Sequence, residues 1–161
     1  MKNRRNEEIN EILFNKKEYK IFIALKKKII DYVELLNYQY SSKNIPYSAM
    51  IIHASEDSMK ETLQNIRKTD IFLNIPYIKN HYLLFFQNTD CKQAIKVGSR
   101  LTSLINRTFM LNKKNISHKV AIVSFEQNPP PVIDLCYEIL LIIKKFKNEN
   151  KDDFWVEIKR F

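Results

Sequence analysis

The chain has 161 residues, of which 27 are Lys or Arg and 18 are Asp or Glu, giving a formal charge of +9. This length suits a single domain, and 45% hydrophobic with 12% aromatic residues excludes a disordered chain. No apolar run approaches the roughly 20 residues that span a bilayer, and the basic start is not followed by an apolar signal core. We therefore expect a cytoplasmic protein without a membrane span.

The cysteines and the positive charge do not indicate a specific function. Two cysteines are too few for a disulfide framework, and no Cys/His cluster has the spacing of a zinc site, so we expect neither a metal nor a cofactor. The charge is compatible with nucleic acid, an anionic membrane surface or an acidic partner. Lysine outnumbers arginine by 21 to 6, as in a protein encoded by an AT-rich gene. Lysines that arise from such a coding bias are spread over the surface and do not indicate a binding face for nucleic acid.

Residues 5–40 are predicted to form one long helix, or two helices if 14–18 holds a turn. Lys26, Lys27 and Lys28 interrupt the apolar stripe and are expected on a solvated face. Pro46 prevents any continuation of the helix. We assign 1–40 to an N-terminal helical region, part of or packed on an α/β domain over 41–161. The apolar stripe consists of Ile9, Ile12, Leu13, Tyr19, Phe22, Ile23, Ile30, Val33, Leu36 and Tyr40.

The next segments predict a strand, a short helix and a hairpin. Residues 47–54 form a mostly apolar strand, and Ser58 with Glu61 has the spacing of a capping box for a helix of about three turns. Residues 70–75 and 81–87 read as two strands joined by a five-residue connection, which is typical of a β-hairpin.

The second half predicts two further helices and two strands. Thr89 or Asp90 caps a helix in which Gly98, the only glycine in the chain, permits a close approach to the sheet. Residues 118–125 are apolar on both faces, as in a central strand, and a helix follows over 132–146. A last strand over 154–159 is expected at an edge. The predicted class is α+β, with a five-stranded, mostly antiparallel or mixed sheet and helices on its faces.

This order of elements resembles the GGDEF domain, the palm-like fold of diguanylate cyclases. Leu13–Lys17 looks like the family's "L-x-N-R-R", and Arg67–Asp70 matches its "R-x-x-D". Leu83–Asp90 looks like the strand that leaves the signature turn. The resemblance covers roughly residues 12–160 and implies a palm-like or ferredoxin-like sheet. The segments that carry it are Leu13–Lys17, Ala49–Ser55, Arg67–Asp70, Leu83–Asp90 and Val120–Phe125.

The signature turn itself departs from the family pattern. It reads Ile78, Lys79, Asn80, His81 and Tyr82, without a glycine or a carboxylate, and the family's first metal-binding aspartate is replaced by His53. Mg²⁺ prefers oxygen ligands, and phosphoryl transfer depends on the charge that the metal stabilises. The sequence therefore predicts no catalytic residues and no enzyme activity, but an inactive GGDEF-like signalling or interaction module. The bulky side chains of the turn are expected to fill the space that a guanine would need.

Arg67 and Asp70 match the residues that clamp a cyclic dinucleotide at an inhibitory site of the family. The resemblance therefore implies cyclic di-GMP as a candidate ligand. The alternative is an Arg–Asp pair at a helix end, which contributes at most about 1 kcal/mol when it is exposed. If the ligand binds, Arg67→Ala should abolish detectable binding and leave the fold intact. The other expected partners are a protein or a second copy of the chain, bound through the N-terminal helix.

Two further hypotheses concern histidines and nucleic acid. His53 and His81 would lie close together if their strands are adjacent, but two imidazoles without a third ligand make a poor zinc site. The alternative function, less favoured, is binding of nucleic acid by a basic protein, with bases stacking on aromatic side chains that lie among basic residues. The aromatic candidates are Tyr38, Tyr40, Tyr47, Tyr77 and Phe109.

Overall fold

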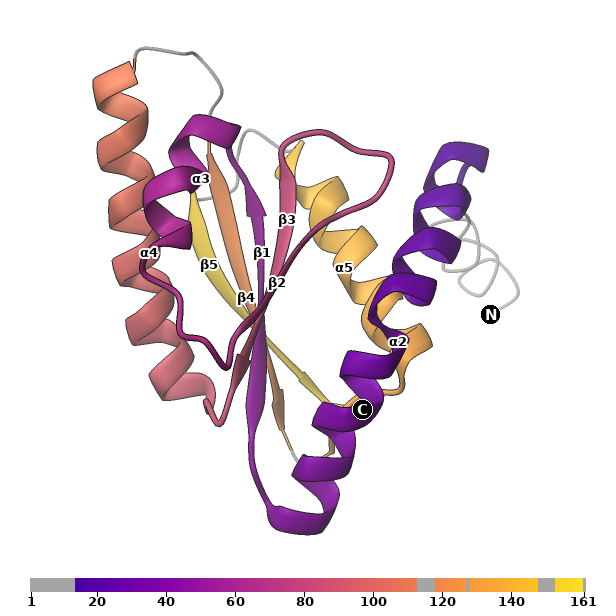
Figure 1. The fold of residues 1–161 in the computed structure, drawn as a ribbon. Coiled ribbons are helices and arrows are strands. Elements are labelled where there is room, and N and C mark those ends of the chain that lie inside the picture. The colour runs from indigo at the N-terminus through magenta and orange to yellow at the C-terminus, as the bar shows by residue number, and fades with distance from the viewer. Residues whose placement is uncertain (1–13, 113–117, 127, 148–152, 161) are drawn as a thin grey trace, which may run out of the picture.

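The computed structural model describes residues 14–112, 118–126, 128–147 and 153–160. The predicted alternation of helices and strands is confirmed over this part of the chain (Figure 1). The elements are α2 (Lys16–Lys43), β1 (Tyr47–His53), α3 (Glu56–Leu63), β2 (Ile71–Asn74), β3 (His81–Gln87), α4 (Cys91–Asn112), β4 (Lys119–Glu126), α5 (Val132–Phe146) and β5 (Phe154–Arg160).

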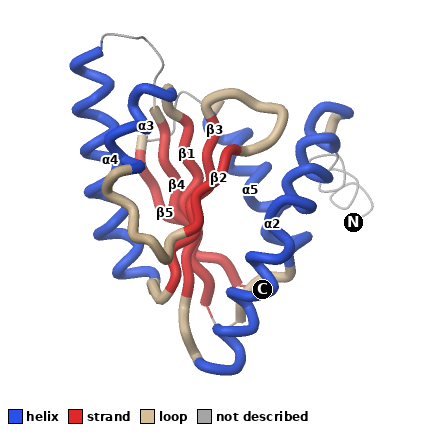
Figure 2. Tube along the Cα trace, viewed as in Figure 1, coloured by secondary structure: helices blue, strands red, loops and turns tan. Residues whose placement is uncertain are grey.

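The five strands form one mixed sheet in the order β2-β3-β1-β4-β5. β1 pairs antiparallel with both β3 and β4, β2 pairs antiparallel with β3, and β4 pairs parallel with β5 (Figure 2). The predicted class, a mostly antiparallel sheet with helices around it, is therefore confirmed. β5 lies at an edge as expected, and the strand predicted from 118–125, β4, is an interior strand between β1 and β5, as its apolar residues on both faces indicated.

Helices cover both faces of the sheet and create two hydrophobic cores. Side chains alternate along a strand, so Ala49 and Ile51 of β1 face α2 and α5, while Met50 and Ile52 face α3 and α4 (Figure 1). A strand that is buried on both faces has apolar residues at successive positions rather than at alternate ones. This requirement explains the unbroken apolar runs of β1, β3 and β4.

The long helix α2 belongs to the first core. Its stripe of Ile21, Leu25, Ile29, Val33 and Leu36 is buried against the sheet and α5. The helix begins after Asn15, whose side chain accepts a hydrogen bond from the backbone N–H of Glu18 in the first turn. The candidate seam residues at 9, 12 and 13 lie outside the described residues. None of the helices in the described part of the chain has the length and apolar composition needed to cross a membrane.

Helix α2 ends at Asn44, which adopts the left-handed conformation with φ 56°. Its backbone N–H donates to the Tyr40 carbonyl, and the Ile45 N–H donates to the Gln39 carbonyl, which together close the helix. We expect Asn44→Ala to lower the free energy of unfolding by about 1 kcal/mol, because a Cβ disfavours this conformation, and Asn44→Gly to be nearly neutral. Chemical denaturation of both variants tests the expectation, and equal losses would contradict it.

The start of α3 differs from the sequence expectation, whereas that of α4 agrees with one of its two predicted caps. The capping box at Ser58 and Glu61 is wrong, because α3 begins earlier, with Ser55 accepting a hydrogen bond from the Ser58 backbone N–H (3.2 Å), and ends at Leu63 after eight residues. At α4 the cap is Asp90, which exchanges hydrogen bonds with Gln93 (2.8 and 3.0 Å). This reciprocal pair is the capping arrangement that the sequence analysis placed on α3.

Candidate functional site

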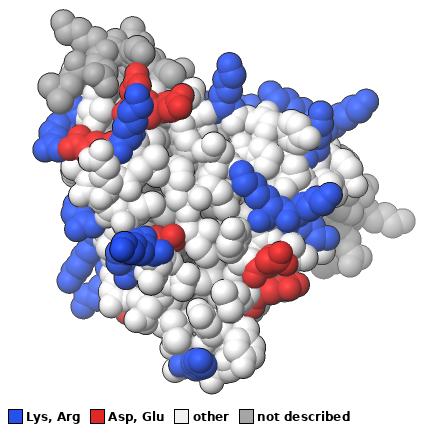
Figure 3. All heavy atoms as spheres, viewed as in Figure 1, with Lys and Arg blue, Asp and Glu red and all other residues white. Residues whose placement is uncertain are grey.

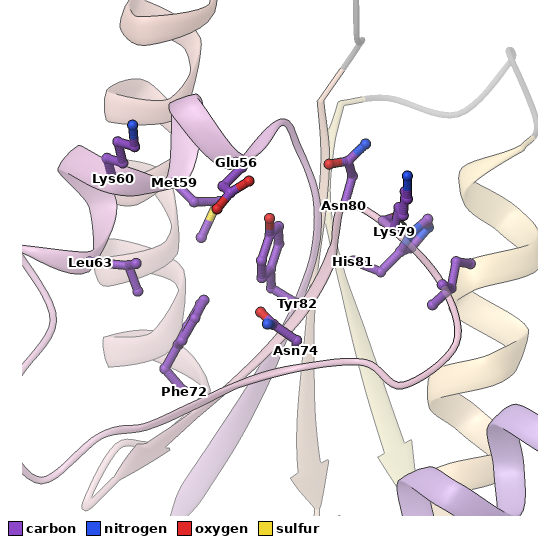
Figure 4. Close-up of a pocket in the computed structure, with 11 residues that line it drawn as sticks. Glu56, Met59, Lys60, Leu63, Phe72, Asn74, Lys79, Asn80, His81 and Tyr82 are labelled. Carbon is purple, nitrogen blue, oxygen red and sulfur yellow. Dashed lines mark hydrogen bonds between the residues drawn. The ribbon is translucent and has the colours of Figure 1, made fainter.

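A cleft of about 750 Å³ lies between α3 and the turn that joins β2 to β3 (Figure 4). The helix contributes one wall, and the two strands with their turn contribute the other. All five residues of the predicted signature turn, Ile78 to Tyr82, are among its lining residues. The others are Glu56, Met59, Lys60, Leu63, Phe72 and Asn74.

The turn lines this space instead of filling it. Asn80 adopts a left-handed conformation with φ 61°, which asparagine tolerates better than most residues, and so redirects the chain into β3 without a glycine. His81 and Tyr82 then follow as the first residues of β3. Ile78 and Lys79 lie at the border of the cleft, and that their side chains would exclude a guanine stays a prediction.

The cleft combines aromatic and polar groups. The rings of Phe72 and Tyr82 stack with centroids 5.6 Å apart and an interplanar angle of 21°. Burial and, secondarily, the Glu56 carboxylate raise the pKa of the Tyr82 phenol, which therefore stays neutral and can donate a hydrogen bond. Lys60 and Lys79 supply positive charge from opposite sides (Figure 4). These groups suit a planar ligand that carries a negative charge.

The lining contains one carboxylate, that of Glu56. Across the described residues, no group of three or more His, Cys, Asp or Glu side chains gathers in a way that could hold a metal ion. Binding of a polyphosphate through two Mg²⁺ ions normally uses several carboxylate oxygens. The cleft can contact a ligand through stacking, amide and lysine groups, and no described side chains form a metal centre in it.

Arg67 and Asp70 lie at the other end of the hairpin from the turn. The Arg67 guanidinium donates to both Asp70 carboxylate oxygens (2.9 and 3.3 Å), to the Gln87 carbonyl (2.9 Å) and to the Thr89 hydroxyl (2.9 Å). The Arg67 backbone N–H also donates to Asp70 (3.0 Å). The pair therefore fastens the loop before β2 to the end of β3.

The Asp70 side chain is only 2% exposed, although that of Arg67 is 49% exposed. The pair is therefore not an exposed one on the Asp70 side, and removing Arg67 would leave a buried carboxylate with fewer donors. Beside the pair lies a smaller pocket of about 290 Å³ with an apolar floor and a second cation, Arg100, on its wall. A ligand at this end of the hairpin would meet both guanidinium groups.

His53 and His81 are brought together as the sequence analysis suggested. They lie directly opposite each other on β1 and β3, with rings stacked at 4.5 Å and 20°. Phe146 of α5 lies within 6.3 Å of both rings, and the Nδ1 of His81 donates to the Lys79 carbonyl (2.7 Å). No third metal-ligating side chain joins them among the described residues.

The histidine pair predicts a loss of stability in mild acid. Burial, the neighbouring His53 and the Lys147 ammonium lower the pKa of His81 to about 4, against the hydrogen bond to Lys79, which raises it. Burial and Lys119 also lower the pKa of His53. In the unfolded chain this histidine takes up a proton near pH 6.5, whereas in the folded chain it does so only near pH 4. The contribution of neutral His81 to stability is therefore complete above pH 6.5 and is lost as the pH falls.

We expect the free energy of unfolding to fall by about 2 kcal/mol between pH 7 and pH 5. Urea denaturation at the two pH values measures this change, and His81→Gln is the control because glutamine does not titrate. The variant should lose less than half as much stability as the wild type over the same range. An equal loss in the two proteins would contradict the assignment to His81.

Sequence reasoning missed the α3 wall of the cleft. Glu56 and Lys60 lie one helical turn apart and so share a face of α3, which was the available signal. That this face meets the β2–β3 turn depends on the packing of α3 against α4, which the sequence pattern does not determine. No protein-family model matches the chain, and comparison with curated proteins gives no significant match. The function is therefore inferred from the geometry of the site.

Proposed function

We propose that the chain is a catalytically inactive, GGDEF-like module that acts by binding and not by chemical turnover. The observation that carries the proposal is the cleft at the β2–β3 turn, which has one carboxylate, two lysines and a stacked aromatic pair among its lining residues. Such a site favours contact with a planar anionic ligand or an interaction surface over metal-assisted phosphoryl transfer. We place the module in the cytoplasm, in keeping with its two free cysteines, Cys91 and Cys136.

The absence of turnover is tested with GTP and either Mg²⁺ or Mn²⁺. Purified protein should form neither cyclic di-GMP nor pyrophosphate, while an active diguanylate cyclase assayed in parallel should form both. Clear turnover by this chain would overturn the proposal. The assay is independent of any binding measurement.

Cyclic di-GMP is the small ligand that we propose for the Arg67–Asp70 end of the hairpin. Its phosphates and guanine edges suit bidentate contacts with guanidinium groups. Arg67→Ala is a poor test of this, because it also removes partners of the buried Asp70 carboxylate. Arg100→Ala is better, because Arg100 lines the same pocket and lies outside the Arg67–Asp70 hydrogen bonds.

Calorimetry with cyclic di-GMP should give binding by the wild type and about tenfold weaker binding by Arg100→Ala, with an unchanged melting temperature. Lys96→Ala, at an exposed position one turn earlier in α4, is the matched control and should bind as the wild type does. No heat from the wild type at high micromolar ligand would reject this ligand. A protein-interaction module would then remain.

Self-association through the N-terminal helix is the remaining proposal for a partner. Within α2 the main apolar stripe is buried in the chain's own core, so a second copy would contact other side chains. Tyr19, Ile23, Leu35 and Tyr38 are large, exposed side chains of α2. We expect light scattering to show a dimer for the full chain and a monomer for a version that begins at Asn15. If both versions are monomeric, self-association is contradicted. If both are dimeric, the interface lies on α2 itself.

A further inference from the structure

A second hollow lies on the opposite side of the hairpin loop from the cleft. It is a groove of about 470 Å³ between the first half of α2 and the loop that joins β2 to β3. Tyr19 and Tyr77 line it together with Lys16, Lys20 and Lys27. We call it the α2–loop groove, and it shares no lining residue with the cleft.

The two tyrosines present aromatic surface to solvent. Tyr19 is 59% exposed and Tyr77 is 61% exposed. Tyr77 also has φ 62°, a left-handed conformation that disfavours a bulky side chain, so the loop holds this ring outward at a conformational cost. A ring displayed in this way is available to stack against a planar ligand.

The charge of the groove is of one sign. Among the residues that the structure describes, its lining contains three lysines and no carboxylate, and the Lys20 ammonium lies 4.4 Å from the centroid of the Tyr77 ring. Figure 3 shows basic side chains over the side of the molecule where α2 and the β2–β3 loop lie, with acidic side chains below them and further basic side chains on the opposite side. An occupant of this groove therefore carries negative charge.

We propose that the α2–loop groove binds single-stranded nucleic acid. Exposed aromatic rings beside a line of cations are the combination that such ligands require, because bases stack on the rings while lysines contact the phosphates. In a duplex the bases are stacked on one another, so no base face is free to stack on the tyrosine rings. An acidic peptide would pair with the lysines but would supply no planar group to stack on the exposed tyrosine rings. This site uses neither the cleft nor Arg67, and it shares Tyr19 with the exposed α2 side chains named for self-association.

The test is fluorescence anisotropy with labelled oligothymidylate and oligouridylate of about 12 nucleotides, a length within the range that such grooves cover. We expect both strands to bind more tightly than a duplex of the same length. Tyr77→Ala and Tyr19→Ala should each weaken binding about tenfold, while Tyr77→Phe should keep it. Lys20→Gln should reduce the slope of log K against log salt by about 0.7, as expected for one lost phosphate contact on a single strand.

Two matched variants separate this site from general attraction to a basic protein. Tyr38→Ala removes an equally exposed tyrosine at the far end of α2, and Lys96→Gln removes an exposed lysine on α4. Both should bind as the wild type does, and thermal melts confirm that each variant is folded. The proposal is overturned if Tyr77→Ala binds normally, if Lys96→Gln costs as much as Lys20→Gln, or if duplex binds as tightly as single strand. It is also overturned if an oligoglutamate peptide of equal charge displaces the oligonucleotide.

Discussion

Replacing Arg67 with alanine is expected to lower the free energy of unfolding by about 2 to 3 kcal/mol. The loss is large because the Asp70 carboxylate is buried and would keep only the backbone N–H of residue 67 from its present donors. The carbonyl of Gln87 and the hydroxyl of Thr89 would each lose the same guanidinium. Chemical denaturation at neutral pH measures the change.

Arg107 supplies the matched control for this prediction. It forms an ion pair with Glu61 in which both side chains are substantially exposed, so Arg107→Ala should cost no more than about 0.5 kcal/mol. Adding Asp70→Asn to Arg67→Ala should recover part of the lost stability, because the buried charge is removed. Equal effects of Arg67→Ala and Arg107→Ala would show that burial of Asp70 does not determine the outcome.

Replacing Gly98 with valine should lower the free energy of unfolding by about 3 kcal/mol. A Cβ at this position of α4 would lie 2.3 Å from the Cδ1 atom of Ile122 and 3.3 Å from a ring carbon of Phe154. Ile122 is fully buried between the helix and the sheet, so it has little room to move away. Gly98→Ala should cost less, since alanine gains about 1 kcal/mol of helix propensity.

The contact with Ile122 is tested by a double-mutant cycle. Ile122→Val removes the Cδ1 atom, so the cost of Gly98→Ala should become smaller in that background than in the wild type. Ser99→Val, at the next and exposed position of the same helix, reports the intrinsic cost of valine in α4. If the two substitutions are additive, steric contact with β4 is not the reason for the glycine.

The helices and strands were predictable because each carries a local signal. The helical character of α2, the apolar run of β1 and the connection between β2 and β3 follow from periodicity and turn chemistry. The buried face of α2 was predicted less well, because its stripe shares only Val33 and Leu36 with the predicted one and the predicted Tyr19 is exposed. The order of strands is not local. Nothing in 47–53 distinguishes a strand at the centre of the sheet from one beside it, because burial on both faces gives the same pattern in either place.

The candidate sites were predictable only where partners lie on paired strands. The approach of His53 to His81 follows from the pairing of β1 with β3, and the sequence suggested it. The burial of Asp70 and the contact of Lys20 with Tyr77 depend on how loops lie against other elements, which periodicity does not encode. Likewise, the cap of the short α3 at Ser55 was missed because Ser55, Asp57 and Ser58 are all favoured N-cap residues within four positions.

The central place of β1 has a consequence for biosynthesis. β1 leaves the ribosome first among the strands, yet it pairs with β3 on one side and β4 on the other. At about 5 to 20 residues per second, β4 follows β1 after a delay on the order of several seconds. Until then the nascent chain carries a strand that is apolar on both faces and open along one edge. Helix α2, which is made before β1 and packs over one of its faces, is the element available to shield it during that interval.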